Sequence, residues 1–120
     1  MKRRILLVED EGAVAGYLRT FLEQEGFEVT LAQTIARAKE VLVSPFDLVM
    51  LDLNLPDGTG DEFLPVLKKA QPHTPVLMVT GASAEDDRIV KCLQSGAVGC
   101  VNKAARLDEI IRHLRRTLAD

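Results

Sequence analysis

The sequence contains no tryptophan and few other aromatic residues, which together fill 4% of its 120 positions. Its two cysteines, Cys92 and Cys100, lie too far apart for the CxxC spacing of a metal or redox site, and no histidine cluster accompanies them. We therefore expect two buried free thiols, with neither a metal nor a disulfide at these positions.

Long hydrophobic runs are also missing. The basic start MKRR resembles that of a signal peptide, but the apolar stretch after it stops at Glu9. No other apolar run is long enough to span a bilayer, so we expect a cytoplasmic protein with no membrane contact. The net charge of -3 also argues against direct nucleic-acid binding, because a binding domain would carry an excess of basic residues.

What the sequence does contain is a regular alternation of short apolar runs and longer amphipathic stretches, repeated five times. The predicted strands are 3–8, 27–32, 46–52, 74–81 and 97–103, and the predicted helices are 11–26, 34–43, 60–71, 83–93 and 107–118. This pattern predicts an α/β fold of three layers, with a doubly wound, five-stranded parallel sheet of flavodoxin-like order 2-1-3-4-5. The length suits a single domain over residues 1–120.

Local signals mark several helix ends. Gly26 is placed to end the first helix, and Thr34 to begin the second. Ser83 with Asp86 three residues later has the spacing of a capping box, which predicts that the fourth helix begins at Ser83.

Polar residues follow the predicted strands at the ends where a doubly wound sheet binds its ligands. They are Glu9 and Asp10 after the first strand, Asp52 after the third, Thr80 after the fourth, and Asn102 and Lys103 after the fifth. Because these ends meet at one edge of the sheet, we expect three acids, a hydroxyl and an amine to share a shallow crevice.

Carboxylates held close together repel one another unless a cation joins them, and Mg²⁺ prefers oxygen ligands of this kind. Lys103 adds a positive charge that suits a phosphoryl oxygen. These are the parts of a phosphoryl-transfer site, with Asp52 as the best candidate for the acceptor. Asp57 is interpreted as a turn residue of the Pro-Asp-Gly sequence.

At this point the residues match a known family: the chain resembles the receiver domain of two-component response regulators over nearly its full length. Each motif alone is weak, but together and in order they are specific. The matching positions are Glu9 and Asp10 after ILLV, Asp52 in VMLDLNLPDGTG, Thr80 and Gly81 in VLMVTGA, and Lys103 in GCVNKA.

The resemblance implies that a phosphohistidine on a sensor histidine kinase, or on a phosphotransfer protein, donates its phosphoryl group to Asp52. Mg²⁺ would be held by Asp10, Asp52 and the backbone carbonyl of Asn54, with Glu9 acting mostly through water. Thr80 and Lys103 would contact phosphoryl oxygens. Such a domain is a signalling module, not an enzyme in the usual sense, although it promotes its own phosphorylation and slow dephosphorylation.

The resemblance also implies an output surface. Movement of Thr80 would alter the face made by the fourth helix, fifth strand and fifth helix, which could bind an output partner or a second phosphorylated copy. Two departures from the family pattern affect this region. Cys100 replaces the usual aromatic residue, and Ala104 replaces the usual proline after Lys103. Since a cis bond before a non-proline residue costs about 3 kcal/mol, we expect a trans Lys103–Ala104 bond and a rearranged loop.

Two other functions stay open from sequence. The domain could be a pseudo-receiver, an interaction module without a working phospho-switch. The full set of acids, Thr80 and Lys103 argues against that hypothesis, but Cys100 and Ala104 keep it open. It could also be a Mg²⁺-dependent phosphatase with Asp52 as nucleophile, although Asn54 stands where such enzymes commonly have a second acid. A plainer interpretation treats the acids as helix caps and loop residues, but the matching Thr80 and Lys103 argue against it.

Overall fold

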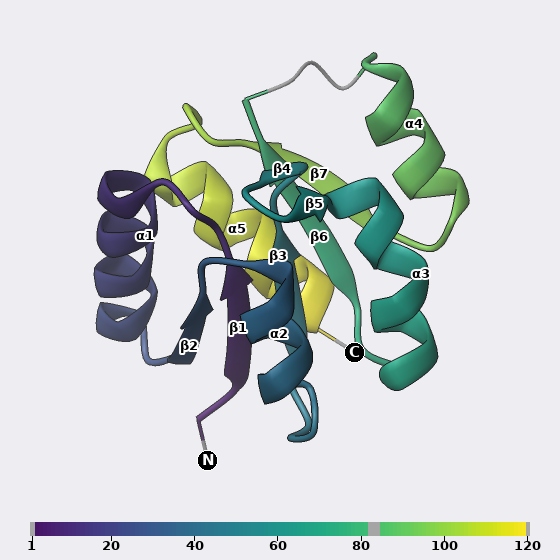
Figure 1. Ribbon diagram of the computed structural model, residues 1–120. Helices are drawn as coiled ribbons and strands as arrows, with labels where there is room; N and C mark the ends of the chain where they lie inside the picture. The colour runs from purple at the N-terminus through teal and green to yellow at the C-terminus, as the bar shows by residue number, and fades with distance from the viewer. Residues whose placement is uncertain (1, 82–84, 120) are drawn as a thin grey trace.

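The computed structural model describes residues 2–81 and 85–119, and it consists of a central sheet with helices on both faces (Figure 1). The sheet has five strands, all parallel, in the order β2-β1-β3-β6-β7. Their bounds are β1 (Arg4–Val8), β2 (Glu28–Ala32), β3 (Leu48–Leu51), β6 (Val76–Thr80) and β7 (Gly99–Asn102). Because β6 and β7 are the fourth and fifth predicted strands, the predicted order 2-1-3-4-5 is confirmed.

The helices form the two outer layers. Helices α1 (Gly12–Gln24) and α5 (Leu107–Leu118) pack on one face of the sheet, and α2 (Ile35–Val41), α3 (Gly60–Ala70) and α4 (Asp87–Gln94) pack on the other. Side chains alternate between the faces along each strand. In β1, Ile5 and Leu7 join the core under α1 and α5, whereas Leu6 and Val8 join the core under α2, α3 and α4.

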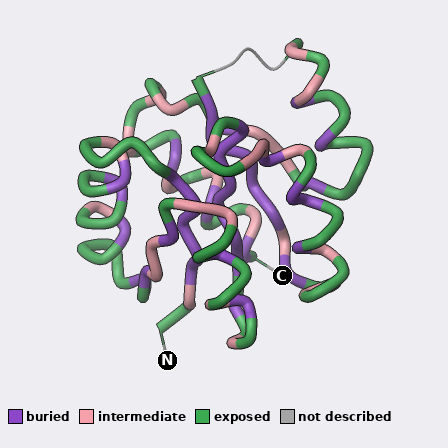
Figure 2. Tube along the Cα trace, viewed as in Figure 1, coloured by how far each residue is buried: buried purple, intermediate pink, exposed green. Residues whose placement is uncertain are grey.

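The central strands are buried on both faces, as their continuous apolar sequences predict. Every residue of β3 and β6 is buried, and Figure 2 shows the buried trace concentrated in the middle layer. The helices expose their outer faces. Because both sides of the sheet are covered, a polar group on these strands reaches solvent at the strand ends, where the candidate site residues lie.

The predicted helix ends are confirmed in two cases. The Thr34 hydroxyl accepts a hydrogen bond from the Arg37 N–H and caps α2. Gly26 follows α1 with a φ of 96°, a left-handed conformation that glycine adopts without strain. The predicted start of α4 was wrong, because this helix begins at Asp87. Its N-cap is Asp86, whose carboxylate accepts a hydrogen bond from the Arg88 N–H. Ser83 lies outside the described residues.

One feature was not predicted. The stretch after Asp52 forms a small antiparallel hairpin of β4 (Asn54–Leu55) and β5 (Gly58–Thr59), with Asn54 paired to Thr59. The Pro-Asp-Gly sequence makes the turn, as expected, but the residues on each side of it are paired. The hairpin joins the end of β3 to the start of α3 and so fixes the backbone beside Asp52.

Across residues 2–81 and 85–119, no helix combines the length and the apolar composition that crossing a bilayer requires.

Candidate functional site

Backbone hydrogen bonds continue past the strands and align the residues that follow them. The Asp52 N–H donates to the Val8 carbonyl, and the Lys103 N–H donates to the Thr80 carbonyl, each at 3.0 Å. These bonds tie the end of β3 to β1 and the end of β7 to β6. The side chains of Asp52 and Lys103 therefore leave the sheet at the same edge as the acid pair after β1.

Lys103 lies at the centre of the charged side chains. Its Nζ donates to Oδ2 of Asp52 at 2.9 Å and to Oε1 of Glu9 at 3.0 Å, and it lies 3.7 Å from Oε1 of Glu11. The side chain is 15% exposed. Burial lowers the Lys103 pKa, but the hydrogen bonds to Asp52 and Glu9 and the negative charges of these two acids together outweigh burial and leave that pKa raised. The amine is therefore held firmly in its charged form.

Glu9 is the fully buried acid of the pair, whereas Asp10 is exposed. Burial raises the pKa of Glu9 to about 7, against smaller opposing effects from the Glu11 N–H, which donates to Oε1, and from Lys103. The negative charge of Asp52 raises it further. Glu9 therefore sits where an additional cation would favour its charged form.

The three predicted acids meet as expected. Carboxylate oxygens of Glu9, Asp10 and Asp52 all lie within 4.8 Å of one another. In the described part of the chain, Oε2 of Glu9 and Oδ1 of Asp52 are buried and have no hydrogen-bond partner. Unpartnered buried carboxylate oxygens are costly, and a hard divalent cation with oxygen ligands would satisfy them. The donor set therefore fits Mg²⁺.

The other predicted residues lie beside this cluster. Thr80 is buried at the end of β6, opposite Asn102 of β7 in the strand register and next to Lys103 in the backbone pairing. Asn54 begins β4, and its side chain is turned to Arg88, whose Nη1 donates to Oδ1 of Asn54 at 3.1 Å. The carbonyl that the resemblance assigns to the metal therefore belongs to a residue of the hairpin.

The backbone of Gly60 packs directly against the backbone of Asp52. A Cβ at this position would overlap the carbonyl oxygen of Asp52 and would lie 3.2 Å from the Cα of Leu53. The Gly60 N–H donates to the Leu53 carbonyl at 2.7 Å. The chain can pass this close behind Asp52 only where the residue has no side chain.

Sequence reasoning missed Glu11 and Arg88, and it assigned Asp57 only part of its role. Glu11 is an exposed acid just before α1, and Arg88 is one of many arginines, so nothing in the sequence marks either as a residue of the site. Asp57 does make the turn, but its carboxylate also accepts hydrogen bonds from the N–H groups of Ile35 and Ala36, at 2.8 and 2.9 Å. The hairpin thereby caps α2.

The loop after Lys103 has a trans backbone, which confirms the expectation for Ala104: no cis peptide bond occurs in residues 2–81 and 85–119. Unlike proline, Ala104 has an N–H that needs a partner. The Asn102 side chain supplies one, since its Oδ1 accepts from the Ala104 N–H at 2.8 Å. The Tyr17 hydroxyl of α1 also donates to the Lys103 carbonyl at 3.4 Å.

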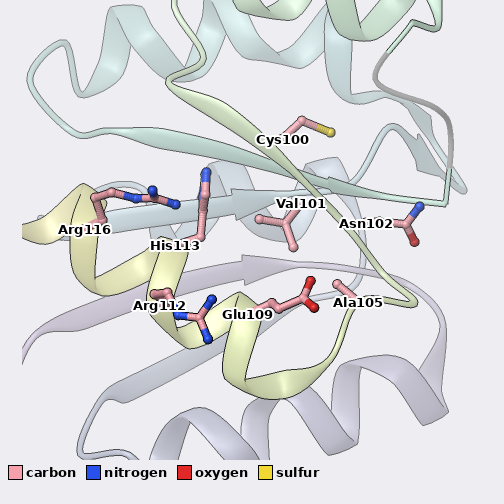
Figure 3. Close-up of a pocket in the computed structure, with 8 residues that line it drawn as sticks. All are labelled: Cys100, Val101, Asn102, Ala105, Glu109, Arg112, His113 and Arg116. Atoms are coloured by element: carbon pink, nitrogen blue, oxygen red, sulfur yellow. The ribbon is translucent and has the colours of Figure 1, made fainter.

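The two cysteines lie on the α4 side of the sheet and are not bonded to each other. Cys92 is buried as predicted, and burial raises the pKa of its thiol to about 11. The prediction that Cys100 is buried was wrong: it is half-buried, because β7 is an edge strand. Cys100 is among the residues that line a cavity of about 340 Å³ between β7 and α5. Figure 3 shows Cys100 together with another lining residue, His113 of α5.

Comparisons with known proteins agree with this geometry. A family described as "Response regulator receiver domain" matches residues 5–115. The KDP operon transcriptional regulatory protein KdpE of Escherichia coli is 38% identical over 95% of this chain and 50% of its own length. The cell cycle transcriptional regulator CtrA of Caulobacter vibrioides is 35% identical over 92% of this chain and 48% of its own length. The chain thus spans about half the length of these curated relatives.

Solved structures are similar over almost all of both chains. A CheY-like receiver domain from Methanospirillum hungatei has a TM-score of 0.91 and 29% identity, covering 98% of this chain and 94% of its own. The non-phosphorylated HemR receiver domain from Leptospira biflexa has a TM-score of 0.89 and 36% identity, covering 99% of this chain and 96% of its own. The similarity therefore includes the whole sheet and both helical layers.

Proposed function

This chain belongs to the response regulator receiver domain family, whose general function is phosphorylation on an aspartate, and we propose that Asp52 is its phosphoacceptor. The proposed donor is a phosphohistidine on a sensor histidine kinase or phosphotransfer protein. An oxygen of Asp52 attacks phosphorus, the bond from phosphorus to the imidazole nitrogen breaks, and the products are an acyl phosphate and free histidine.

The observation that carries this proposal is the position of the Asp52 carboxylate. It is 2% exposed, one oxygen accepts from Lys103, and the other is buried without a hydrogen-bond partner among the described residues. Lys103 orients this carboxylate, and the oxygen without a protein partner is the one that a Mg²⁺ ion would bind, which leaves the oxygen facing Lys103 for attack on phosphorus. Asp57, five residues later, uses both oxygens to cap α2 and has no such freedom.

The acid cluster supports a Mg²⁺ requirement. Glu9, Asp10 and Asp52 would hold the ion with the backbone carbonyl of Asn54, and the ion would neutralise charge on the phosphoryl oxygens. Lys103, already charged and within hydrogen-bond distance of Asp52, would bind a phosphoryl oxygen after transfer. The hydroxyl of Thr80, at the adjacent strand end, would bind another.

We infer that phosphorylation changes the face made by α4, β7 and α5. Apolar side chains are exposed on this side at Val90, Leu93 and Val98, and the cavity between β7 and α5 is lined partly by Arg112 and Arg116 (Figure 3). Exposed apolar groups beside basic ones suit a protein partner. A second phosphorylated copy is one candidate, and an output domain is another, since the relatives named above are transcriptional regulators.

We also propose that residues 1–120 act as one receiver domain and that it works in the cytoplasm, where ATP supplies the histidine kinases that would phosphorylate it. As in other receiver domains, the acyl phosphate would be lost slowly by hydrolysis. The same Mg²⁺ and Lys103 that favour transfer would assist attack by water at phosphorus, which releases inorganic phosphate and restores the Asp52 carboxylate.

The test is phosphorylation by a small acyl phosphate. The protein is incubated with Mg²⁺ and acetyl phosphate, and its intact mass is measured together with that of Asp52→Asn and of the matched control Asp57→Asn. We expect one added phosphoryl group on the natural protein and on Asp57→Asn, and none on Asp52→Asn. A pseudo-receiver would give no adduct on any of the three, and a phosphatase would release phosphate without a lasting adduct.

A further inference from the structure

Arg88 connects α4 to the hairpin beside the phosphorylation site. It is the second residue of α4, and its backbone N–H donates to Oδ1 of Asp86, the N-cap of the helix, at 2.8 Å. Its side chain contacts the same Asp86 oxygen through Nε at 3.4 Å and reaches Oδ1 of Asn54 through Nη1 at 3.1 Å. The guanidinium therefore spans the gap between the start of α4 and the start of β4.

Asn54 lies two residues after Asp52, so their α-carbons are at most roughly 7 Å apart. Asp52 is 2% exposed, whereas Asn54 is exposed and Arg88 is half-buried. A phosphoryl group on Asp52 cannot extend into the packed sheet. It must extend outward from the strand ends, on the side where Asn54 and Arg88 lie. The Arg88 guanidinium therefore lies within a side-chain movement of the new group.

Phosphorylation changes which acceptor is best for the guanidinium. In the unmodified protein Nη1 bonds a neutral amide oxygen, whereas a phosphoryl group brings about two negative charges and three strong acceptor oxygens. Hydrogen bonds between charged groups are roughly twice as strong as neutral ones, and arginine matches phosphoryl geometry especially well. Because the contact with Asp86 keeps Nε of Arg88 at the start of α4, a shift of Nη1 toward the phosphoryl group would also displace the start of α4.

We propose that Arg88 is a further phosphoryl-binding residue, which Asn54 holds in the unphosphorylated protein and which links the phosphoryl group directly to the start of α4. This inference rests on the proposed phosphorylation of Asp52. What distinguishes this role of Arg88 from a purely structural one is that Asn54 competes with the phosphoryl group for the guanidinium. If Arg88 merely fastened α4 to the hairpin, loss of either partner would have the same effect.

The competition can be measured with fluoroberyllate, a phosphoryl mimic, titrated in the presence of Mg²⁺ against the natural protein and three variants. We expect Arg88→Ala to weaken binding by about 3- to 10-fold, from loss of one partly exposed charge-assisted bond, and Arg88→Lys to weaken it less. Asn54→Ala should strengthen binding by roughly 2-fold, because it frees the guanidinium. The matched control is Arg37→Ala, which removes an exposed arginine paired with Glu40 on α2 and should bind as the natural protein does.

The outcomes separate this inference from the function on which it rests. Equal binding by the natural protein and Arg88→Ala would overturn it, and so would similar weakening by Arg88→Ala and Asn54→Ala, which indicates a structural link alone. Absence of fluoroberyllate binding to the natural protein, or undiminished binding to Asp52→Asn, would instead contradict the proposed function. Backbone amide NMR shifts of α4 provide a second readout, which should respond to fluoroberyllate less in Arg88→Ala.

Discussion

Gly60 lies so close to the carbonyl of Asp52 that a single added carbon distorts the site. We expect Gly60→Ala to lower the free energy of unfolding by about 2 kcal/mol, because the new Cβ must push the backbone of Asp52 aside. Gly16 is the matched control, since it is an exposed glycine inside α1 and a Cβ there would meet nothing within 4 Å. Gly16→Ala should raise stability by about 0.5–1 kcal/mol. Urea unfolding of both variants checks the pair, and a neutral Gly60→Ala would contradict the close approach.

Glu9 should make the stability of the metal-free protein depend on pH. Its pKa is about 7 in the folded protein, chiefly because it is buried, against 4.5 as the ordinary value. Between these values the folded protein keeps a proton that the unfolded chain has released, so the stabilising contribution of Glu9 is present below pH 4.5 and is lost as the pH rises through 7.

Glu9→Gln removes this titration. Relative to that variant, the natural protein should lose on the order of 3 kcal/mol of unfolding free energy between acidic and mildly alkaline pH. Urea unfolding in EDTA at several pH values measures the difference. A difference between the two proteins that stays constant across the range would show that Glu9 does not titrate there.

Whether a contact between single residues could be predicted depends on whether the strand topology sets it, and not on how far apart the residues lie in the sequence. The convergence of Glu9, Asp52 and Lys103 could be predicted because parallel strands end at a common edge, and topology alone brings their last residues together. The Arg88–Asn54 bond joins positions 34 residues apart, one in the small hairpin and the other in the first turn of α4. Neither residue has a periodicity or a neighbour that indicates such a partner, so this contact required the structure.

The hairpin of β4 and β5 links the segment that follows Asp52 to α2. The Asp57 carboxylate caps the helix through Ile35 and Ala36, and these two N–H groups lower the pKa of Asp57. The turn was predictable from Pro-Asp-Gly, but the cap was not, because the helix that it serves begins 22 residues earlier in the chain.

We expect Asp57→Ala to loosen the first turn of α2 while leaving the sheet intact. The amides of Ile35 and Ala36 would lose their acceptors and exchange with solvent several-fold faster, as hydrogen-exchange NMR can measure. Glu40→Ala is the control on the same helix, because it removes an exposed ion pair with Arg37 and no cap. Unchanged exchange at Ile35 and Ala36 in Asp57→Ala would contradict this role.

At the scale of the whole molecule, the fold explains why the candidate site residues lie at one edge of the sheet. Strand order, helix placement and burial follow from hydrophobic patterns that are readable in the sequence, and the predicted order was confirmed. The half-buried position of Cys100 could not be predicted, because the pattern of β7 does not indicate how much an edge strand is covered.

Chemical mapping can identify the residue that carries the phosphoryl group. After incubation with Mg²⁺ and acetyl phosphate, borohydride reduces the acyl phosphate of an aspartate to the alcohol of homoserine with loss of phosphate, and peptide mass spectrometry finds the altered position. We predict homoserine at position 52, formed with Mg²⁺ and absent when EDTA is added. Homoserine at Asp10 or Asp57 in place of Asp52, or equal conversion with and without Mg²⁺, would contradict the proposed role of Asp52.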